Sequence, residues 1–359
     1  MGMDGLRDLG FFTQRLLGGR RGQAEELGGV AVSWWRRHQL SRRGVEITLG
    51  VLWLVDGALQ FQPSMFTRGF FVDTLGMANM GLPGPVATVE YALTSMLAAH
   101  PAVWNPLFAS LQVALGVGLL WRRTARLALG LSILWALAVW VVGEGFGGLF
   151  MGGTSLLTGA PGAALLYALI AIALWPRRDR SARSGQSIAD GGLLGGTVAR
   201  WSWLVLWIGT AALELEPASH VPGAQLTNAG EDEPAVVAAV NHAVGGLFTG
   251  RGILFAVVFG LLQIAIGMGV LAQRTRRWAL SAGIGLALAT GILGQDLGGL
   301  LTGHATDPGT GPLLVLFALT LWPREATEKA GGAPTGSGAA RATRALSWGS
   351  DRAWAGARL

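Results

Sequence analysis

The chain of 359 residues contains no cysteine, a single lysine and only 13% charged residues. Without cysteine it can form no disulfide, no catalytic thiol and no thiolate-bound zinc or iron–sulfur centre of its own. The lysine, Lys329, lies outside every long apolar stretch, which excludes an embedded Schiff base. Soluble domains carry about 25% charged residues. The scarcity of charge, with 51% hydrophobic residues, therefore indicates an integral membrane protein.

Eight apolar stretches are long enough, or nearly so, to cross a hydrocarbon core, which requires about 20 helical residues. They lie at 45–62, 104–121, 126–143, 160–175, 201–216, 253–271, 277–294 and 309–322. The sequence therefore predicts an all-α integral membrane fold with eight transmembrane helices.

The second half of the chain repeats the first half. Residues 112–148 and 263–299 align without a gap at an offset of 151, and 17 of the 37 pairs are identical. Upstream, ALQFQP at 58–63 matches ALELEP at 212–217. Each repeat holds four spans, and an even number gives both repeats the same orientation. We therefore predict two parallel four-helix repeats with long outer loops.

This organisation predicts five segments along the chain. They are a cytoplasmic amphipathic lead at 1–44, the first membrane repeat at 45–176, a basic cytoplasmic linker at 177–200, the second repeat at 201–323 and a disordered basic cytoplasmic tail at 324–359. Within the outer loops, segments 85–99 and 234–248 have helical composition and begin at or just after a proline.

The cations give the orientation. The predicted inner segments are 1–44, 122–126, 177–200, 272–277 and 323–359. Of the 27 Lys and Arg residues, only Arg68 and Arg251 fall outside them. The positive-inside rule therefore predicts a multi-pass protein of the cell membrane with both termini in the cytoplasm. The inner basic belt is expected to contact anionic lipid headgroups. We do not interpret this charge as a nucleic-acid-binding surface.

Polar side chains within the spans are the candidate functional residues, because such groups are costly in a bilayer and usually have a purpose. They lie mostly in the outer halves of the spans and are expected to line a polar cavity in each repeat. The candidates for binding a cofactor are Asp56, Gln60, Gln112 and Glu144 in the first repeat and Glu214, Gln263 and Gln295 in the second. The alternative is structural: such groups often only hydrogen-bond across a helix interface.

The sequence does not identify a cofactor. The histidines lie outside the spans, so no embedded pair can hold haem, and there is no iron–sulfur or flavin motif. His242, His304 and Glu216 are weak metal candidates on the outer side, because imidazole and carboxylate together bind transition metals. No ligand spacing of the HxxxH type supports such a site.

Each repeat resembles the DoxX/DoxD-like group of four-helix membrane proteins. The pattern LGVLWLVDGALQF at 49–61 and the hairpin LQVALGVGLLWRRTARLALGLSIL at 111–134, echoed at 262–284, carry this resemblance. It implies four spans with cytoplasmic termini. Some members of the group are linked to quinone-reducing thiosulfate oxidation or to redox-stress complexes. This chain differs in having two fused repeats, large outer loops and no cysteine.

Three functions remain open at this point. The first is a membrane subunit or anchor of a redox complex, with a quinone as the candidate cofactor and a membrane or extracytoplasmic redox protein as the partner. The second is a small-solute or proton-coupled transporter, in which Asp56 and Glu214 would relay protons. The third is a structural or assembly protein whose acidic outer loops dock a basic partner.

Overall fold

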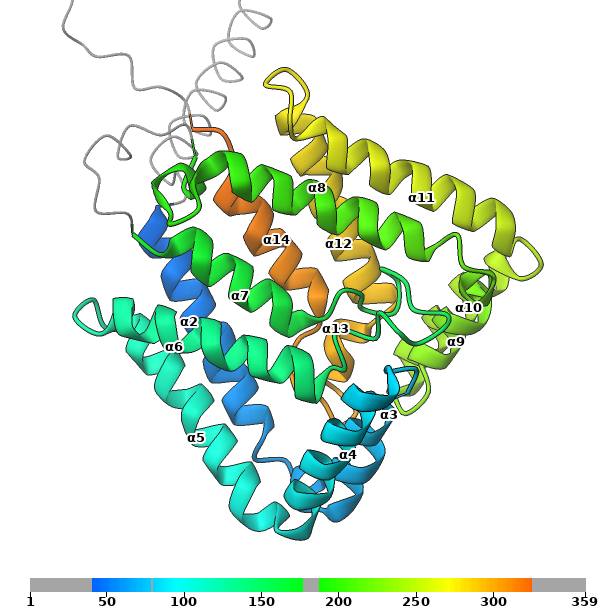
Figure 1. Cartoon of the computed structure of the whole chain (residues 1–359). Coiled ribbons are helices and arrows are strands. Elements are labelled where there is room, and N and C mark those ends of the chain that lie inside the picture. The colour runs from blue at the N-terminus through cyan, green and yellow to red at the C-terminus, as the bar shows by residue number, and fades with distance from the viewer. Residues whose placement is uncertain (1–40, 79, 177–186, 325–359) are drawn as a thin grey trace, which may run out of the picture. The chain divides into compact units, whose positions relative to one another are not determined.

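The computed structural model describes residues 41–78, 80–176 and 187–324, and over these ranges the chain is helical, with connecting turns and no strand (Figure 1). Three helical segments are long and apolar enough to cross a membrane. They are α5 (Pro101–Leu120), α11 (Gly252–Gly269), and α6 (Ala125–Ala138) together with its π-helical extension η3 (Val139–Gly143). The all-α class and the presence of candidate membrane spans are thus confirmed for the described residues.

Helices also occupy the other five predicted stretches. They are α2 (Arg42–Leu59), α7 (Ala163–Leu174), α8 (Gly195–Leu213), α12 (Arg276–Leu293) and α14 (Thr310–Leu321). Helix α8 begins at Gly195, within the segment that the sequence predicts as the linker. Most of the predicted lead, the first part of the linker and nearly all of the tail lie outside the described residues.

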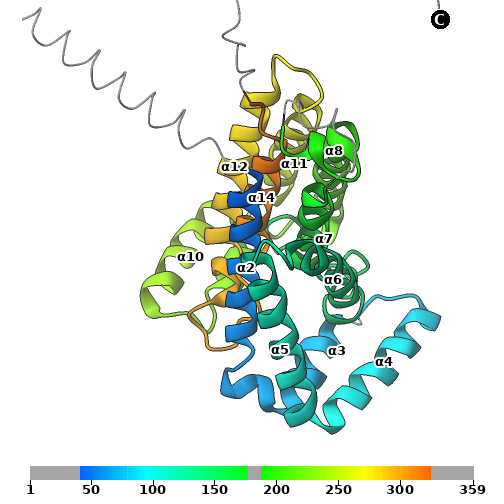
Figure 2. The ribbon, with the colours of Figure 1, turned by 90° about the vertical axis from the view of Figure 1, so that its left-hand side faces the viewer.

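Short helices fill the connections between the long ones. The helices expected at 85–99 and 234–248 are present as α4 and α10. Proline stands at the N-cap of both helices, and a second proline opens the first turn of α4, where its missing N–H costs nothing. Figure 2 shows α3 (Leu75–Ala78) and α4 (Gly84–Ala99) at the lower end of the bundle, at the same height as the lower part of α5. The connecting helices are η2 (Phe70–Thr74), α3 (Leu75–Ala78), α4 (Gly84–Ala99), α9 (Pro222–Ala229), α10 (Ala235–Phe248) and α13 (Asp296–Gly299), with 3-10 turns at Pro63–Phe66, Ala189–Gly191 and Pro217–Ser219.

The helices of the two halves pack in the same way. Helix α2 packs on α5 as α8 packs on α11, and α6 packs on α7 as α12 packs on α14. Helices α7 and α14 contact each other between the halves (Figure 1), while α14 also contacts α2 and α7 also contacts α8. The described residues of both halves belong to a single compact unit. The repeats are therefore two halves of one helix bundle.

The inner hairpins show how closely the structure follows the sequence repeat. In the first hairpin the Thr124 hydroxyl donates to the Gly118 carbonyl oxygen at 2.8 Å. In the second, the Thr275 hydroxyl donates to the Gly269 carbonyl oxygen at 2.7 Å. These positions match at the offset of 151, so the same side chain closes the same turn twice.

Close helix contact and an apolar exterior complete the bundle. Glycine lets α2 approach α5, because a Cβ on Gly50 would lie only 3.0 Å from the carbonyl oxygen of Gly116.

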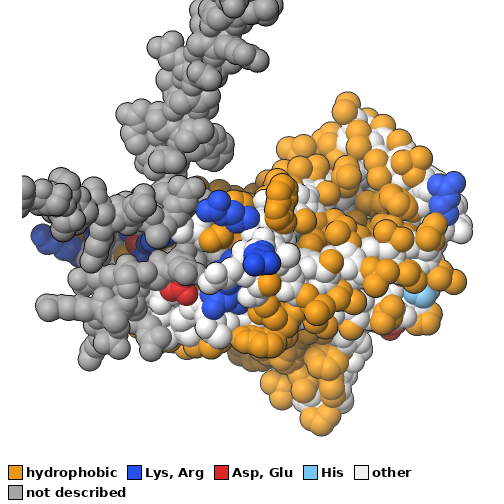
Figure 3. Space-filling model, turned by 90° about the horizontal axis from the view of Figure 1, so that it is seen from above, with side chains coloured by type: hydrophobic (Ala, Val, Ile, Leu, Met, Phe, Trp, Pro, Cys, Tyr) orange, Lys and Arg blue, Asp and Glu red, His pale blue; other side chains and the backbone are white. Residues whose placement is uncertain are grey.

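Large apolar side chains such as Leu127, Leu134 and Leu261 are exposed on the outer faces of α6 and α11. The face drawn in Figure 3 is largely hydrophobic, with its charged side chains in small groups. An exposed apolar area of this extent is typical of a surface that contacts lipid or another protein.

Candidate functional site

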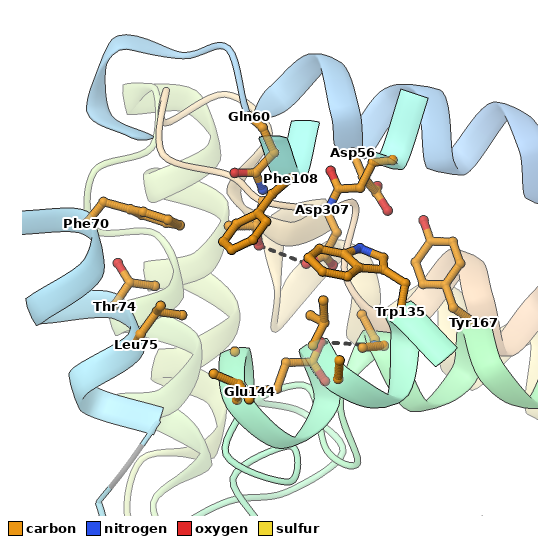
Figure 4. A pocket seen from close by; sticks show the side chains of 18 of the residues that line it. Asp56, Gln60, Phe70, Thr74, Leu75, Phe108, Trp135, Glu144, Tyr167 and Asp307 are labelled. Atoms are coloured by element: carbon orange, nitrogen blue, oxygen red, sulfur yellow. Dashed lines mark hydrogen bonds between the residues drawn. The ribbon is translucent and has the colours of Figure 1, made fainter. Parts of the chain in front are cut away.

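A cavity of about 250 Å³ lies among the four long helices of the first repeat. Asp56, Gln60, Gln112 and Glu144 all line it, and these are the four candidates that the sequence provides in this repeat. Figure 4 labels Asp56, Gln60 and Glu144 around the cavity. The structure therefore brings together residues from α2, α5 and the end of η3 that are far apart in the chain.

Helical spacing explains why these side chains share one cavity. On α2, Trp53, Asp56 and Gln60 follow one another at i, i+3 and i+7, which places them on one face. On α5, Phe108 and Gln112 are four residues apart and also share a face. Each helix thus presents one aromatic ring together with polar groups to the same space.

Aromatic rings form part of the cavity wall. Trp53 and Tyr167 lie against each other with ring centroids 4.2 Å apart, and Phe108 lies 5.2 Å from Trp135. The indole N–H of Trp53 donates to the buried hydroxyl of Ser132 at 2.8 Å, which fixes the ring between α2 and α6. The wall is therefore held by hydrogen bonding as well as by ring contact.

The cavity contains an unusual number of polar atoms without a hydrogen-bond partner. Leaving a buried polar group unpaired costs about 1–3 kcal/mol, and most such groups in folded proteins are paired. Asp56 and Tyr167 are each 2% exposed, so bulk water does not satisfy them. Figure 4 shows the Tyr167 hydroxyl pointing toward Asp56. Tyr167 and Asp56 have only each other as side-chain partners, and three further atoms have none: Gln112 Oε1, Trp135 Nε1 and Glu144 Oε2. Together they offer both donors and acceptors to a bound molecule.

The two carboxyl oxygens of Glu144 make different contacts. Its Oε1 accepts a hydrogen bond from the backbone N–H of Ala164 at 2.9 Å, in the first turn of α7. Its Oε2 lies against Gly162, where a Cβ would be only 2.1 Å away and where φ is +98°, so glycine is required there. Burial raises the pKa of Glu144 to about 8, and the nearby carboxylate of Asp307 adds to this effect.

Asp307 reaches the same cavity from the other half of the chain. It lies in the loop that precedes α14 and accepts hydrogen bonds from the Thr306 hydroxyl and the Gly309 N–H, both at 2.8 Å. Burial raises the pKa of this carboxyl above its ordinary value, although both hydrogen bonds oppose the shift. Among the residues that line the cavity there is no lysine or arginine. Its carboxyls therefore have no cationic side chain beside them.

The three candidates of the second repeat do not line this cavity. Gln263 Nε2 donates to Glu214 Oε1 at 3.2 Å, which is the bond across a helix interface that the structural alternative predicts. Gln295 Oε1 accepts from the backbone N–H of Thr310 at 2.9 Å, in the first turn of α14. The side chains at these positions are therefore held by contacts within the second repeat and its fourth long helix.

An exchange of loops explains much of this asymmetry. The loop before α14 reaches the first repeat, where Gln62 Nε2 donates to the Ala305 carbonyl oxygen at 3.2 Å. The loop before α7 reaches the second repeat, where Gln225 Nε2 donates to the Gly153 carbonyl oxygen at 2.8 Å. Each repeat is thus covered by a loop from the other repeat, and the two loops differ in sequence.

The exchanged loops bring opposite chemistry to the two halves. The first repeat receives Thr306 and Asp307 at the edge of its cavity. The second receives Leu156 and Leu157, both buried, and a Cβ on Gly294 would lie 2.5 Å from Leu157 Cδ1. Apolar side chains therefore pack where the first repeat has a polar cavity.

Tyr167, Trp135 and Asp307 line the cavity but were not among the candidates proposed from sequence. Tyr167 is one of only two tyrosines and lies within an apolar stretch, which is a signal that sequence inspection could have used. Trp135 corresponds to Leu286 at the repeat offset, so comparison of the two copies could also have identified it. Asp307 depends on the exchange of loops, which the sequence does not reveal.

The weak metal candidates remain unsupported. Within the described ranges, no group of three or more His, Asp or Glu side chains is arranged to hold a metal ion. His242, His304 and Glu216 are therefore not part of such a group.

Comparison with protein-family models, with curated proteins and with solved structures finds no match. The similarity to DoxX/DoxD-like proteins consequently remains a hypothesis supported by the residues that suggested it.

Proposed function

We propose that the chain is an integral membrane subunit of a redox complex, and that the cavity of its first repeat binds a quinone headgroup. In this proposal all eight long helices cross the cell membrane as two parallel repeats, with both termini in the cytoplasm. The observation that carries the proposal is the set of unpartnered donors and acceptors in one aromatic-lined cavity.

The chemistry of a quinone fits this lining in both redox states. A quinone carbonyl accepts hydrogen bonds, and Trp135 and Tyr167 have N–H and O–H groups to donate. A hydroquinone donates two hydrogen bonds, and Asp56, Gln112 and Glu144 have oxygens free to accept them. The flat ring would stack against the aromatic wall. A volume of about 250 Å³ suits a headgroup whose tail remains outside the cavity.

Charge supports the proposed orientation. The inner hairpins carry Arg122, Arg123 and Arg126 in the first repeat and Arg274 and Arg277 in the second. Placed in the cytoplasm, they follow the positive-inside rule and meet anionic headgroups. The cavity then opens toward the outer half of the bilayer, because Glu144 and Asp307 lie at the opposite ends of the helices from these hairpins.

Electrons must come from a separate protein in this proposal. The chain has no cysteine for an iron–sulfur cluster or a redox disulfide. Its contribution is to bind and orient the headgroup and to supply or accept protons through Asp56 and Glu144. A membrane or extracytoplasmic redox protein is the expected partner.

The two alternatives have less support. A transporter needs a path through the bundle, yet the segments of α2 and α5 nearer the arginine-rich hairpins pack Val45, Leu49, Leu115 and Leu119 into the apolar core. A purely structural role gives no partner to Gln112 Oε1, Trp135 Nε1 and Glu144 Oε2, which line one cavity.

Quinone binding by the purified protein tests the proposal. The protein is extracted from native membranes in mild detergent, and co-purifying proteins and extracted quinones are identified by mass spectrometry. Binding of decylubiquinone and of menaquinone-4 is then titrated on wild type, Gln112→Leu and Tyr167→Phe. The matched control is Gln263→Leu, which makes the same change at the equivalent position of the second repeat.

Loss of a buried hydrogen bond to the ligand predicts about tenfold weaker binding or more for Gln112→Leu and Tyr167→Phe. Gln263→Leu is expected to bind as wild type does. The proposal is wrong if no quinone binds, or if the change at Gln263 weakens binding as much as the change at Gln112. Recovery of a stoichiometric redox enzyme supports the assignment as a subunit.

A further inference from the structure

Three cavities meet at Glu144. The first is the cavity that contains Asp56. The second, of about 270 Å³, is lined by Glu144, Asp307 and Gln295 together with Thr158 and loop glycines. The third, of about 330 Å³, is lined by Glu144 and the glycine-rich loop that precedes α7. Glu144 lines all three, so it lies where the Asp56 cavity adjoins the two cavities at the loop end of the helices.

The other end of the Asp56 cavity is closed. Trp53 contacts Tyr167 at a centroid distance of 4.2 Å and is hydrogen-bonded to Ser132. Beyond these rings, Leu49 and Ile170 are fully buried in the apolar core. The residues that line the cavity include none from the arginine-rich hairpins. The carboxyl groups that line the cavity therefore continue toward the loop end and not toward the hairpins.

The groups along this route are suited to carry protons. Asp56 is buried, and its side-chain partner is the Tyr167 hydroxyl. The Glu144 carboxyl faces Asp307 from the loop before α14, Asp56 from α2 and Tyr167 from α7. No lysine or arginine lines any of the three cavities. A proton is thus the available counter-charge for these carboxyls.

We propose that the Asp56 cavity exchanges protons with the loop end of the bundle through Glu144 and Asp307, and not with the arginine-rich end. In each step an O–H bond of a carboxylic acid breaks, the proton passes to a water molecule, and a carboxylate remains to accept the next proton. The purpose of this route rests on the proposed function, since a bound hydroquinone releases two protons on oxidation and a quinone takes up two on reduction.

The absence of cysteine makes accessibility a direct test, because every introduced thiol is the only one in the protein. Thr158→Cys samples the two loop-end cavities, and Ala164→Cys samples the Asp56 cavity. Ala171→Cys, further along α7 and fully buried in the apolar core, is the matched control. Intact cells that express each variant are treated with a membrane-impermeant methanethiosulfonate. Labelling after unfolding in detergent measures the total thiol.

The route predicts that Thr158→Cys and Ala164→Cys react in intact cells, while Ala171→Cys reacts only after unfolding. It also predicts an effect on hydrogen–deuterium exchange, measured by infrared spectroscopy after transfer from H₂O to D₂O. The C=O band of the remaining buried carboxylic acids should shift at least tenfold more slowly in Glu144→Gln than in wild type. An unreactive Ala164→Cys, or exchange as fast in Glu144→Gln as in wild type, would overturn it. If these results hold but quinone does not bind, the route stands and the quinone proposal is wrong. If quinone binds but these results do not hold, the quinone proposal stands and the route is wrong.

Discussion

Glu144 and Gln295 occupy equivalent positions in the two repeats and make the same contact. Glu144 Oε1 accepts from the Ala164 N–H at 2.9 Å, and Gln295 Oε1 accepts from the Thr310 N–H at 2.9 Å. Each side chain therefore ties the third long helix of its repeat to the first turn of the fourth. The amide of Gln295 performs this structural task without a charge. The carboxyl of Glu144 is consequently not required by the fold alone.

This equivalence predicts how Glu144→Gln behaves. Burial raises the pKa of Glu144 from 4.5 to about 8 in the folded protein. Between these values the folded state holds a proton that the unfolded chain releases, so stability is greatest below pH 4.5 and falls as pH rises toward 8. Glu144→Gln should keep the contact to Ala164 and reduce this fall.

The check is the melting temperature of the purified protein in detergent at several pH values across this range. Part of the fall should remain in Glu144→Gln, because the pKa of Asp307 is also raised by burial. The exposed carboxyl of Glu231 provides the control Glu231→Gln, which should leave the wild-type slope unchanged. A wild-type slope in Glu144→Gln would contradict the burial of this carboxyl.

Ser132→Ala tests the closed end of the cavity. The Ser132 hydroxyl is the partner of the Trp53 N–H at 2.8 Å, and both residues are buried. Removal of the hydroxyl leaves that N–H without a partner, which should lower the free energy of unfolding by about 1–3 kcal/mol. Chemical unfolding in mixed micelles measures the change. Ser202→Ala is the control, because the hydroxyl of Ser202 bonds only the Val198 carbonyl of its own helix.

Leu156→Ala tests the apolar packing against the second repeat. Leu156 is 1% exposed, and truncation of a buried leucine costs about 2–5 kcal/mol. Leu149 lies in the same loop and is 39% exposed, so Leu149→Ala should cost much less. Thermal unfolding of the two variants gives the comparison. Equal losses would indicate that the loop is not held by the burial of Leu156.

The sequence predicted the helices well because apolar length, proline and the repeat are all local signals. It also identified Asp56, Gln60, Gln112 and Glu144, since a polar residue in an apolar helix is visible without a structure. The same reasoning treated both repeats alike and therefore proposed a second cavity. The two copies differ at these positions, because Asp56 is matched by Thr210, which bonds the Leu206 carbonyl of its own helix, and Trp135 is matched by Leu286.

The remaining difference lies in contacts between distant segments. Asp307 reaches the first repeat, and Leu156 packs against the second, only because the two loops cross between the halves. Neither loop carries a pattern that specifies which repeat it will cover. Their placement follows from the packing of α7 against α14, which is a property of the whole bundle.

Photo-crosslinking with an azido-quinone tests the central claim most directly. The purified protein is irradiated with the analogue, and the modified peptides are mapped by mass spectrometry, with excess decylubiquinone as competitor. The account predicts competable adducts on the segments that carry Trp53, Phe108, Trp135 and Tyr167. Adducts on the matching segments of α8, α11 and α12, or adducts that decylubiquinone does not displace, would contradict it.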